Sequence, residues 1–293
     1  MSPQAKRDTI ANLRARNVSE RRACRLVDRA RSAQRRALQS RNDHDVVNRI
    51  CHIAAERRRF GYRRIHWMLL REGLVINHKK VYRLYRENNL SVRRRRRRSK
   101  RCVDRVPLAI PSGPNHTWSM DFVFDATASG HVLKCLTVVD DCTKESVDIA
   151  VGRKLNGQAV VETLDQACQF RGYPSIIRTD QGPEFTGKIL TGWAADHGVR
   201  LQLTQPGKPT QNAYIESFNG RFRDECLNEN WFVSLKHAQA VIAAWRKDYN
   251  QHRPHSALGR LTPNEFAAQL RITGQLSPSS KESDTLDIYR TTK

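Results

Sequence analysis

The sequence contains no Cys-x-x-Cys pair among its seven cysteines and no apolar run long enough to span a membrane. Its N-terminus also lacks the apolar core of a signal peptide. Several cysteines, such as Cys168, stand where an apolar residue belongs, which predicts buried free thiols in a reducing compartment. These absences argue against a disulfide framework and a membrane-spanning chain, and they favour a cytoplasmic protein.

Acidic residues are scarce in the first third of the chain. Residues 1–100 contain 30 Lys and Arg against 8 Asp and Glu, a net charge of +22, whereas residues 101–293 contain 22 against 21. Such an asymmetry is typical of a nucleic-acid-binding arm joined to a catalytic body. A basic face that only aids solubility would not need so concentrated an excess.

Residues 1–41 form a polar, basic and helix-favouring segment. Ser19 is a suitable N-cap for a helix that begins at Glu20. The continuation after Val27 has no glycine to make a tight turn, so the sequence does not predict a complete helix-turn-helix here. A single charged helix is equally consistent with this segment.

Residues 42–90 predict three helices, at 45–58, 62–71 and 78–87, because apolar residues recur there at helical spacing. Gly73 ends the second helix, and Asn77 caps the third. Short helices joined by tight turns indicate a small all-α, helix-turn-helix-like DNA-binding domain. The basic residues expected to contact DNA from the third helix are Lys79, Lys80, Arg83 and Arg86.

Residues 91–106 form an arginine-rich linker. Like charges at this density repel one another and keep a chain extended, and they bind nucleic acid without sequence preference. The six consecutive residues expected to contact DNA are Arg93, Arg94, Arg95, Arg96, Arg97 and Arg98.

From residue 107 the pattern changes to alternating strands and helices. Three consecutive strands are followed by helices that alternate with two further strands, which is the order of an α/β, ribonuclease-H-like domain. This catalytic core, with its C-terminal helices, is predicted over 107–270, and a disordered tail over 271–293. The strands are expected at 117–125, 131–140, 145–151, 175–179 and 200–204, and the helices at 158–170, 187–197, around Glu216 and at 235–250.

Three acidic residues in this core indicate its chemistry. Asp121 lies in a strand, Asp180 ends a second strand, and Glu216 lies in a helix. Carboxylates that a fold brings together supply the oxygen ligands that Mg²⁺ prefers. Two such ions can stabilise both the attacking and the leaving oxygen of a phosphoryl transfer. Because the chain is strongly cationic, the expected phosphate is that of nucleic acid.

Five runs of this region form a recognisable pattern: Trp118-Ser-Met-Asp-Phe-Val123, Leu136-Thr-Val-Val-Asp-Asp141, Arg178-Thr-Asp-Gln-Gly-Pro-Glu-Phe185, Pro206-Gly-Lys-Pro-Thr-Gln-Asn-Ala-Tyr-Ile-Glu-Ser-Phe-Asn-Gly220 and Arg253-Pro-His-Ser-Ala-Leu258. In these runs the region resembles the integrase-type catalytic core of bacterial insertion-sequence transposases. The resemblance is strongest to the second-reading-frame (OrfB) proteins of the insertion-sequence family numbered three. One residue departs from that pattern, because Gln181 stands where the family usually has Asn.

The resemblance implies a DDE-type transposase in which Asp121, Asp180 and Glu216 bind two Mg²⁺ ions, with Mn²⁺ able to substitute. Such an enzyme cuts DNA at the ends of an insertion sequence and joins the freed 3′ end to a second phosphodiester. The resemblance also implies a frameshift fusion with the upstream OrfA product, a homo-oligomer on DNA, and a place on the bacterial nucleoid. The His-His-Cys-Cys zinc module of retroviral integrases has no counterpart here.

Residues around Glu216 are candidates for DNA contact. Asn212, Glu216, Asn219 and Arg223 follow one another at steps of four, three and four, and so share one helix face. Arg223 is expected to hold a phosphate beside the metals, as are Lys208, Gln211 and Asn212 just before or at the helix start. The neighbouring acids Asp125, Asp140, Asp141 and Glu184 are weaker candidates for metal ligands, and His252 and His255 are expected to pack the last helices.

Two other functions fit the same residues. One is a metal-dependent nuclease without strand transfer, which the basic N-terminal third disfavours. The other is a non-catalytic DNA-binding regulator of the element, which the intact acidic triad disfavours.

Overall fold

A computed structural model describes residues 1–35, 43–92, 111–204 and 212–273. The chain divides into two compact units, Met1–Asn48 and Arg49–Lys293, and each is described by itself. The arginine run 93–98, Lys208, Gln211 and residues 274–293 of the predicted tail lie outside the described residues, whereas residues 271–273 of that tail are helical. Within the described ranges no helix has the length and apolarity needed to cross a bilayer.

The first unit contains the short helices α1 (Pro3–Ala15), α2 (Glu20–Leu26) and α3 (Arg31–Arg35). Ser19 caps α2 as predicted, because its side chain accepts a hydrogen bond from the Arg22 backbone N–H. Asp28 takes a left-handed conformation with φ 52° and so makes the turn that was expected to require glycine. The lack of glycine therefore does not stop the chain from turning into a further helix. The small core of this unit consists of Ile10, Ala23 and Cys24.

Three helices follow at α4 (His44–Glu56), α5 (Tyr62–Arg71) and α6 (His78–Glu87), close to the predicted ranges. Gly73, at φ 82°, makes the turn after α5, and the Asn77 side chain accepts from Lys79 N–H at 2.8 Å to cap α6. The apolar stripes of these helices are buried, as their spacing predicts. Their fully or nearly fully buried side chains are Ile50, Ile53, Ile65, Leu69, Val81, Leu84 and Tyr85.

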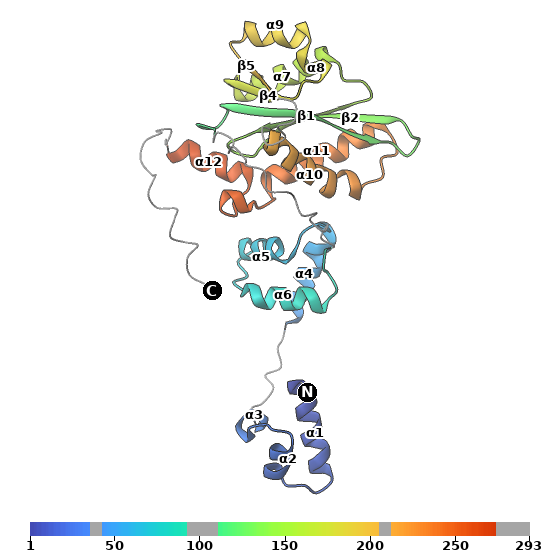
Figure 1. Cartoon of the computed structure of the whole chain (residues 1–293), viewed down its shortest axis with the longest axis vertical. Helices are drawn as coiled ribbons and strands as arrows, with labels where there is room; N and C mark the ends of the chain where they lie inside the picture. Colours follow the sequence, from blue (N-terminus) through green and yellow to red (C-terminus); the bar gives the residue numbers. More distant parts are fainter. Residues whose placement is uncertain (36–42, 93–110, 205–211, 274–293) are drawn as a thin grey trace. The chain divides into compact units, whose positions relative to one another are not determined.

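The second unit is built around a five-stranded mixed sheet in the order β3-β2-β1-β4-β5 (Figure 1). The pairs β1–β2 and β2–β3 are antiparallel, whereas β1–β4 and β4–β5 are parallel. This arrangement confirms the predicted ribonuclease-H-like order. The strands are β1 (Thr117–Ala126), β2 (Val132–Asp140), β3 (Ser146–Gly152), β4 (Ile176–Thr179) and β5 (Arg200–Leu203).

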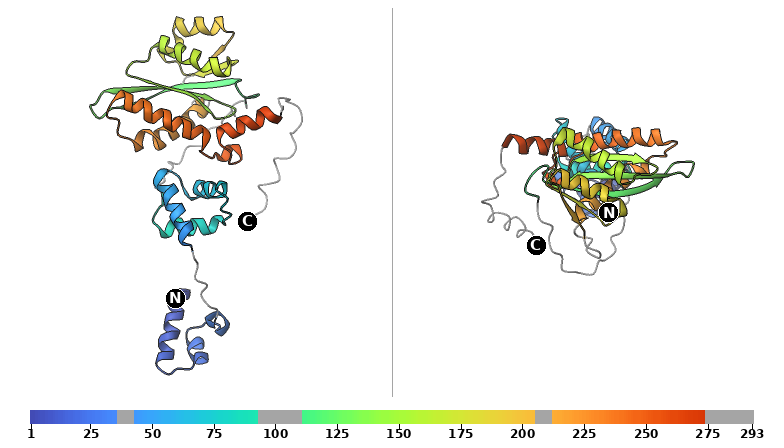
Figure 2. Two further views of the ribbon diagram at one scale, coloured as in Figure 1. Left: turned by 180° about the vertical axis from the view of Figure 1, so that it is seen from behind. Right: turned by 90° about the horizontal axis from the view of Figure 1, so that it is seen from above.

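Helices cover both faces of the sheet, with α7, α8 and α9 on one side and α10 and α11 on the other (Figures 1 and 2). The short α8 and two turns of 3-10 helix were not predicted, because runs of three or four residues carry no periodicity. The helices after β3 are α7 (Gly157–Arg171), α8 (Pro183–Thr186), α9 (Lys188–Asp196), α10 (Ala213–Glu225), α11 (Leu235–Gln251) and α12 (Pro263–Thr273), with 3-10 turns at Leu227–Glu229 and Ser256–Leu258.

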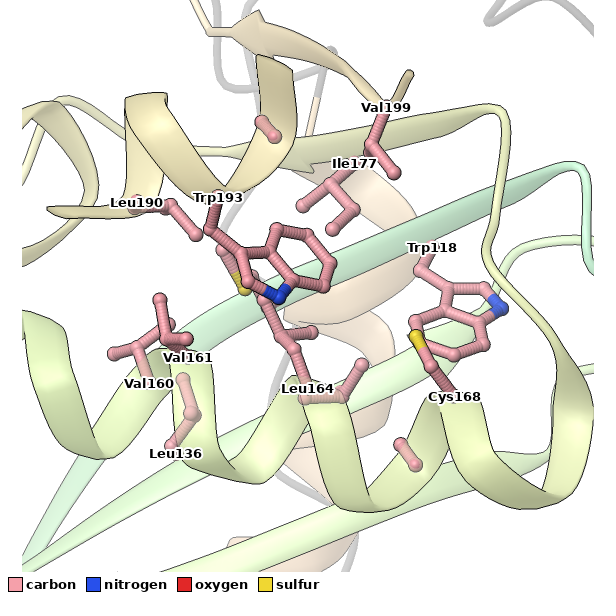
Figure 3. Packing of buried hydrophobic residues seen from close by; sticks show 14 of the residues in the cluster. Trp118, Leu136, Val160, Val161, Leu164, Cys168, Ile177, Leu190, Trp193 and Val199 are labelled. Atoms are coloured by element: carbon pink, nitrogen blue, oxygen red, sulfur yellow. The ribbon is translucent and has the colours of Figure 1, made fainter. Parts of the chain in front are cut away.

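Alternation along β1 divides the core into two clusters. Trp118 and Met120 point to the face covered by α7 and α9, whereas Val123 points to the face covered by α10 and α11. In the first cluster Trp118 and Trp193 pack among aliphatic side chains from α7 and the strands (Figure 3). Since Asp121 shares the parity of Val123, its side chain faces α10, the helix that carries Glu216.

Four arginines between residues 57 and 71 form ion pairs with acidic residues of the same unit that come after the last strand in the sequence. The Arg59–Glu229 pair is 2.6 Å long and the Arg64–Glu225 pair is 3.2 Å. Arg57 pairs with Asp248 and Arg71 with Glu265. These arginines are thus engaged within the protein, unlike the exposed Lys79 of α6, for which the described residues supply no carboxylate partner.

A capping box begins α12. Thr262 N–H donates to Glu265 Oε2 at 2.8 Å, and Glu265 N–H donates to Thr262 Oγ1 at 3.3 Å. Two N–H groups at the helix start are therefore satisfied reciprocally, as this local sequence requires.

Candidate active site

Asp121 lies in the middle of β1, where two hydrogen bonds fix its carboxylate. Phe122 N–H donates to Oδ1 at 2.7 Å, and the Asn219 side-chain amide donates to Oδ2 at 2.9 Å. Asn219 belongs to α10, so this bond joins the central strand directly to the helix that carries Glu216. Asp121 is half-buried, with its carboxylate facing that helix.

Asp180 follows the last residue of β4. The parallel register pairs Ser119 with Arg178, so Asp121 and Asp180 stand two residues further along adjacent strands, at the same end of the sheet. Gly182 N–H donates to Asp180 Oδ1 at 3.0 Å, which orients the carboxylate at the start of the following turn. Parallel pairing therefore brings together two aspartates that are distant in sequence.

Glu216 lies in the first turn of α10, and its side chain is exposed. Ile215, Phe218 and Phe222 of the same helix are buried against the sheet, as their spacing predicts. With that stripe against the core, Glu216 lies on the same helix face as Asn219, whose side chain contacts Asp121.

The three carboxylates are electrostatically coupled. Burial first, and then the negative charges of Asp180 and Glu216, raise the pKa of Asp121 to about 6, against the lowering effect of its hydrogen bonds. Across the described ranges, no three acidic, histidine or cysteine side chains stand at metal-ligand spacing. The site is thus a group of neighbouring acids whose negative charges repel one another.

The raised pKa of Asp121 predicts a pH-dependent stability in the absence of divalent ions. The pKa of this carboxyl is about 6 in the folded protein and about 3.9 in the unfolded chain. The folded state therefore loses stability as pH rises through about 6 and the group becomes ionised. The Asp121→Asn chain should therefore gain about 1–2 kcal/mol relative to wild type between pH 5 and pH 8. Chemical denaturation of both chains in EDTA at the two pH values measures this gain. A constant difference between the two chains would show that neither burial nor the neighbouring acids destabilise the ionised Asp121 carboxylate.

Asn219 positions the Asp121 carboxylate. The sequence predicts that Asn219 lies on the same helix face as Glu216, but it assigns this residue no function. Its Oδ1 lies 2.9 Å from the Thr137 hydroxyl of β2, which also lies 3.1 Å from the Asp121 carbonyl oxygen. The Asn219 amide is thereby oriented with its Nδ2 toward Asp121. Thr137 pairs with Asp121 across the strands, a register that the sequence alone did not supply.

Glu184, the strongest rival ligand, is held by another partner. Lys134 Nζ lies 2.5 Å from Glu184 Oε1, and this hydrogen bond lowers the pKa of Glu184. The same ammonium donates to the Leu155 carbonyl at 3.1 Å and lies 3.9 Å from the centre of the Phe122 ring. The charge of Glu184 is therefore already compensated inside the protein.

The paired aspartates after β2 have structural partners. Asp140 accepts hydrogen bonds from the backbone N–H groups of Asn115, Cys142 and Thr143, and so shapes the turn after β2. Asp141 is fully buried, and Arg178 Nη1 donates to its Oδ2 at 2.7 Å. Neither is available to the site, which agrees with their low ranking as ligands.

The histidines near the C-terminus differ in environment. His255 is buried, its Nδ1 lies 2.8 Å from the Arg253 carbonyl oxygen, and burial together with neighbouring arginines lowers its pKa to about 2. It therefore stays neutral and packs the last helices, as expected. His252 is exposed, with its Nδ1 3.6 Å from Asp248.

The predicted DNA contacts that are described lie on exposed or half-exposed positions. Arg223 is exposed, and its Nη1 makes one long hydrogen bond of 3.4 Å to the Phe124 carbonyl oxygen. Asn212 is half-buried at the start of α10. In α6, Arg83 forms an ion pair with Glu87, and Arg86 lies over the Tyr82 ring.

Comparison with protein families covers most of the chain. An integrase core domain matches residues 111–209 and again residues 197–263, and a helix-turn-helix-like domain matches residues 40–98. These matches coincide with the sheet and its helices and with the three-helix region before the arginine run.

Similarity to individual proteins agrees with these family matches. A 31.7 kDa protein of insertion element IS407 from Burkholderia multivorans is 57% identical over 267 residues, which cover 91% of this chain and 96% of that protein. The putative transposase InsK for insertion sequence element IS150 from Escherichia coli K12 is 28% identical, over 77% of this chain and 83% of its own. A chain of the simian T-cell lymphotropic virus intasome shares the fold, with a TM-score of 0.52 and 15% identity, over 80% of this chain and 78% of that one.

Proposed function

The chain belongs to the insertion-element transposases that carry an integrase core domain, and from that premise we propose that Asp121, Asp180 and Glu216 form its catalytic centre. The reaction is DNA transposition by metal-dependent cleavage at the element ends and strand transfer. The observation that carries the residue assignment is the charge coupling of the half-buried Asp121 to both Asp180 and Glu216.

The donor set fits hard divalent cations. It consists of carboxylate oxygens alone, and the mutual repulsion that raises the pKa of Asp121 would be relieved by a cation among them. Asp121 and Asp180 would hold one Mg²⁺ jointly, and Glu216 a second alongside Asp121. Bound there, the ions supply Lewis-acid stabilisation of the attacking and leaving oxygens of the phosphodiester, and Mn²⁺ is expected to substitute for Mg²⁺.

The chain's own residues prepare this centre. Phe122 N–H and the Asn219 amide hold the Asp121 carboxylate in one orientation, and Thr137 in turn holds Asn219. Glu216 is exposed, and we expect its side chain to move toward Asp121 when substrate is bound. No side chain is required as a nucleophile, because water and then the freed 3′-hydroxyl attack phosphorus in turn.

DNA binding is assigned to the basic N-terminal third and to residues near the site. The net charge of +22 over residues 1–100 supports an electrostatic anchor, and the helix-turn-helix-like match at residues 40–98 supports a DNA-binding role for α6. Lys79, Lys80, Arg83 and Arg86 would contribute from that helix. The linker arginines 93–98 and Lys208, Gln211 and Asn212 complete the proposed contacts.

Assembly is also part of the proposal. The resemblance to second-reading-frame transposases supports a frameshift fusion with an upstream product and a homo-oligomer on DNA. Two DNA ends must be joined in one event, so at least two catalytic cores acting together is the simplest arrangement.

Arg223→Ala should slow strand joining without destabilising the fold. In the described part of the chain its guanidinium makes a single, long hydrogen bond, to the Phe124 carbonyl oxygen, and it lies outside the buried stripe of α10. Loss of one charge-assisted phosphate contact is worth about 1.5–3 kcal/mol, or roughly ten- to more than a hundredfold in rate. Strand-transfer rate and melting temperature are measured for Arg223→Ala beside Arg223→Lys, which should retain part of the rate. Unchanged joining, or a large fall in melting temperature, would contradict this role.

The whole proposal is tested with labelled element ends and Mg²⁺. The full chain is incubated with these ends alone and as a fusion with the upstream product, and the products are separated on a denaturing gel. Transposition predicts both cleaved and joined strands. Cleavage without joined products would instead identify a nuclease, and DNA binding without cleavage in either form would identify a regulator.

A further inference from the structure

An open cavity of about 470 Å³ lies near Asp180, where the start of β2, the segment between β3 and α7, and the start of α8 meet. We call it the cationic cavity, because three of its lining side chains carry positive charge and one carries negative charge. The lining residues that matter here are Lys134, Arg153, Lys154, Asn156, Gly157 and Glu184.

The cavity adjoins the proposed catalytic centre through Gly182. A Cβ added at Gly182 would lie 3.1 Å from Asp180 Oδ1 and 3.5 Å from Glu184 Oε2. The carboxylates of Asp180 and Glu184 therefore flank the same glycine, one facing the catalytic centre and the other lining the cavity.

The three cations of the cavity have different roles. Lys134 is almost buried, and Glu184, the Leu155 carbonyl and the Phe122 ring occupy its ammonium group. Arg153 and Lys154 are exposed, and no hydrogen bond or ion pair engages either side chain in the described part of the chain. The Lys134–Glu184 ion pair thus stabilises one side of the cavity, and the side chains of Arg153 and Lys154 remain exposed to solvent.

This concentration of charge is unusual for the catalytic part of the chain. Residues 101–293 carry 22 Lys and Arg against 21 Asp and Glu, so the region is close to neutral. Two unengaged cations next to a group of coupled carboxylates would offset the repulsion that those acids exert on a polyanion.

We infer that the cationic cavity is a subsite for the phosphodiester backbone of DNA next to the scissile phosphate, with Arg153 and Lys154 as its phosphate contacts. The inference rests on the proposed function, since it assigns the substrate of that centre. Backbone contacts of this kind position the strand and carry no sequence preference. The cavity therefore fixes where the strand lies, and not which sequence is cut.

The test measures binding of the full chain to a duplex of the element end, in Ca²⁺, over a range of salt concentrations. The double variant Arg153→Ala, Lys154→Ala is compared with wild type and with Arg200→Ala, Lys236→Ala, which removes the same charge from two exposed residues that do not line the cavity. Losing two phosphate contacts should lower the slope of log K against log salt by about two and weaken binding roughly tenfold or more at low salt. The control pair should keep the wild-type slope.

A second measurement locates the contact. Neutral methylphosphonates are placed one at a time along the strand that is cut. At one or two positions near the cleavage site, the methylphosphonate should weaken binding by wild type and by the control variant Arg200→Ala, Lys236→Ala. The same methylphosphonate should leave the affinity of the Arg153→Ala, Lys154→Ala variant unchanged, because that variant has already lost the contact. Equal slopes for the two double variants, or the same methylphosphonate profile for all three proteins, would overturn the inference. Absence of Mg²⁺-dependent cleavage by wild type would count against the proposed function alone, because the binding comparison does not depend on catalysis.

Discussion

Asp180→Asn should abolish both DNA cleavage and strand joining while leaving DNA affinity nearly unchanged. The amide keeps the size of the side chain and can still accept the hydrogen bond from Gly182 N–H. It removes the negative charge that a divalent ion needs, and the loss of several kcal/mol of transition-state stabilisation corresponds to about a thousandfold or more in rate. Asp121→Asn and Glu216→Gln should behave alike, since each removes one carboxylate of the same coupled group.

The measurement is product formation from labelled element ends in Mg²⁺ and in Mn²⁺, with affinity measured on the same DNA. Glu184→Gln is the matched control, because Lys134 already neutralises that neighbouring carboxylate. It should keep far more activity than Asp180→Asn. Substantial Mg²⁺-dependent cleavage by Asp180→Asn would refute the catalytic assignment, whereas a loss of DNA affinity would show that Asp180 contributes to binding.

Arg253→Ala should lower the free energy of unfolding by about 3–5 kcal/mol, the usual cost of removing one partner of a buried ion pair. The Arg253 residue is only 2% exposed, and its Nε and Nη2 each donate to Glu225 at 2.6 Å. Its guanidinium also lies 5.5 Å from the centre of the Tyr249 ring. Removing it would leave the Glu225 carboxylate with Arg64 alone and open a gap beneath α11.

Chemical denaturation of the full chain gives this loss, with Arg271→Ala as an exposed arginine that should cost little. Arg253→Met combined with Glu225→Met and Arg64→Met should recover a large part of the stability, because no charge of the Arg64–Glu225–Arg253 group is then left without its partner. A loss for Arg253→Ala no greater than that for Arg271→Ala would show that the pair is not a determinant of the fold.

Local sequence was sufficient wherever an element is decided by its own residues. The range 62–71 is helical because apolar residues recur at helical spacing. Thr262 and Glu265 form the capping box of α12 because these partners are three residues apart. The parity of β1 was predictable for the same reason, since side chains alternate along any strand. Asp121 could therefore be placed opposite the face of Trp118 before the fold was known.

The acidic residues of the candidate site could be predicted from the sequence for a different reason. Asp121, Asp180 and Glu216 were identified by the motifs that surround them, through the resemblance to transposases, and not by any rule that brings them together in space. The motifs identified the three acidic residues, but they did not predict which side chains form hydrogen bonds with them. Asn219 was placed on the correct helix face, yet its bond to Asp121 depends on how α10 packs against β1.

Tertiary structure decided every feature that joins distant segments. The sequence determined the local elements, the charge asymmetry and the acids of the site. Only the fold decided that Arg178 is buried against Asp141, that Lys134 neutralises Glu184, and that Arg153 and Lys154 face an open cavity near Asp180. The physical reason is that pairing, burial and pKa shifts depend on distances across the sheet and between packed helices, and residue order along the chain does not contain those distances.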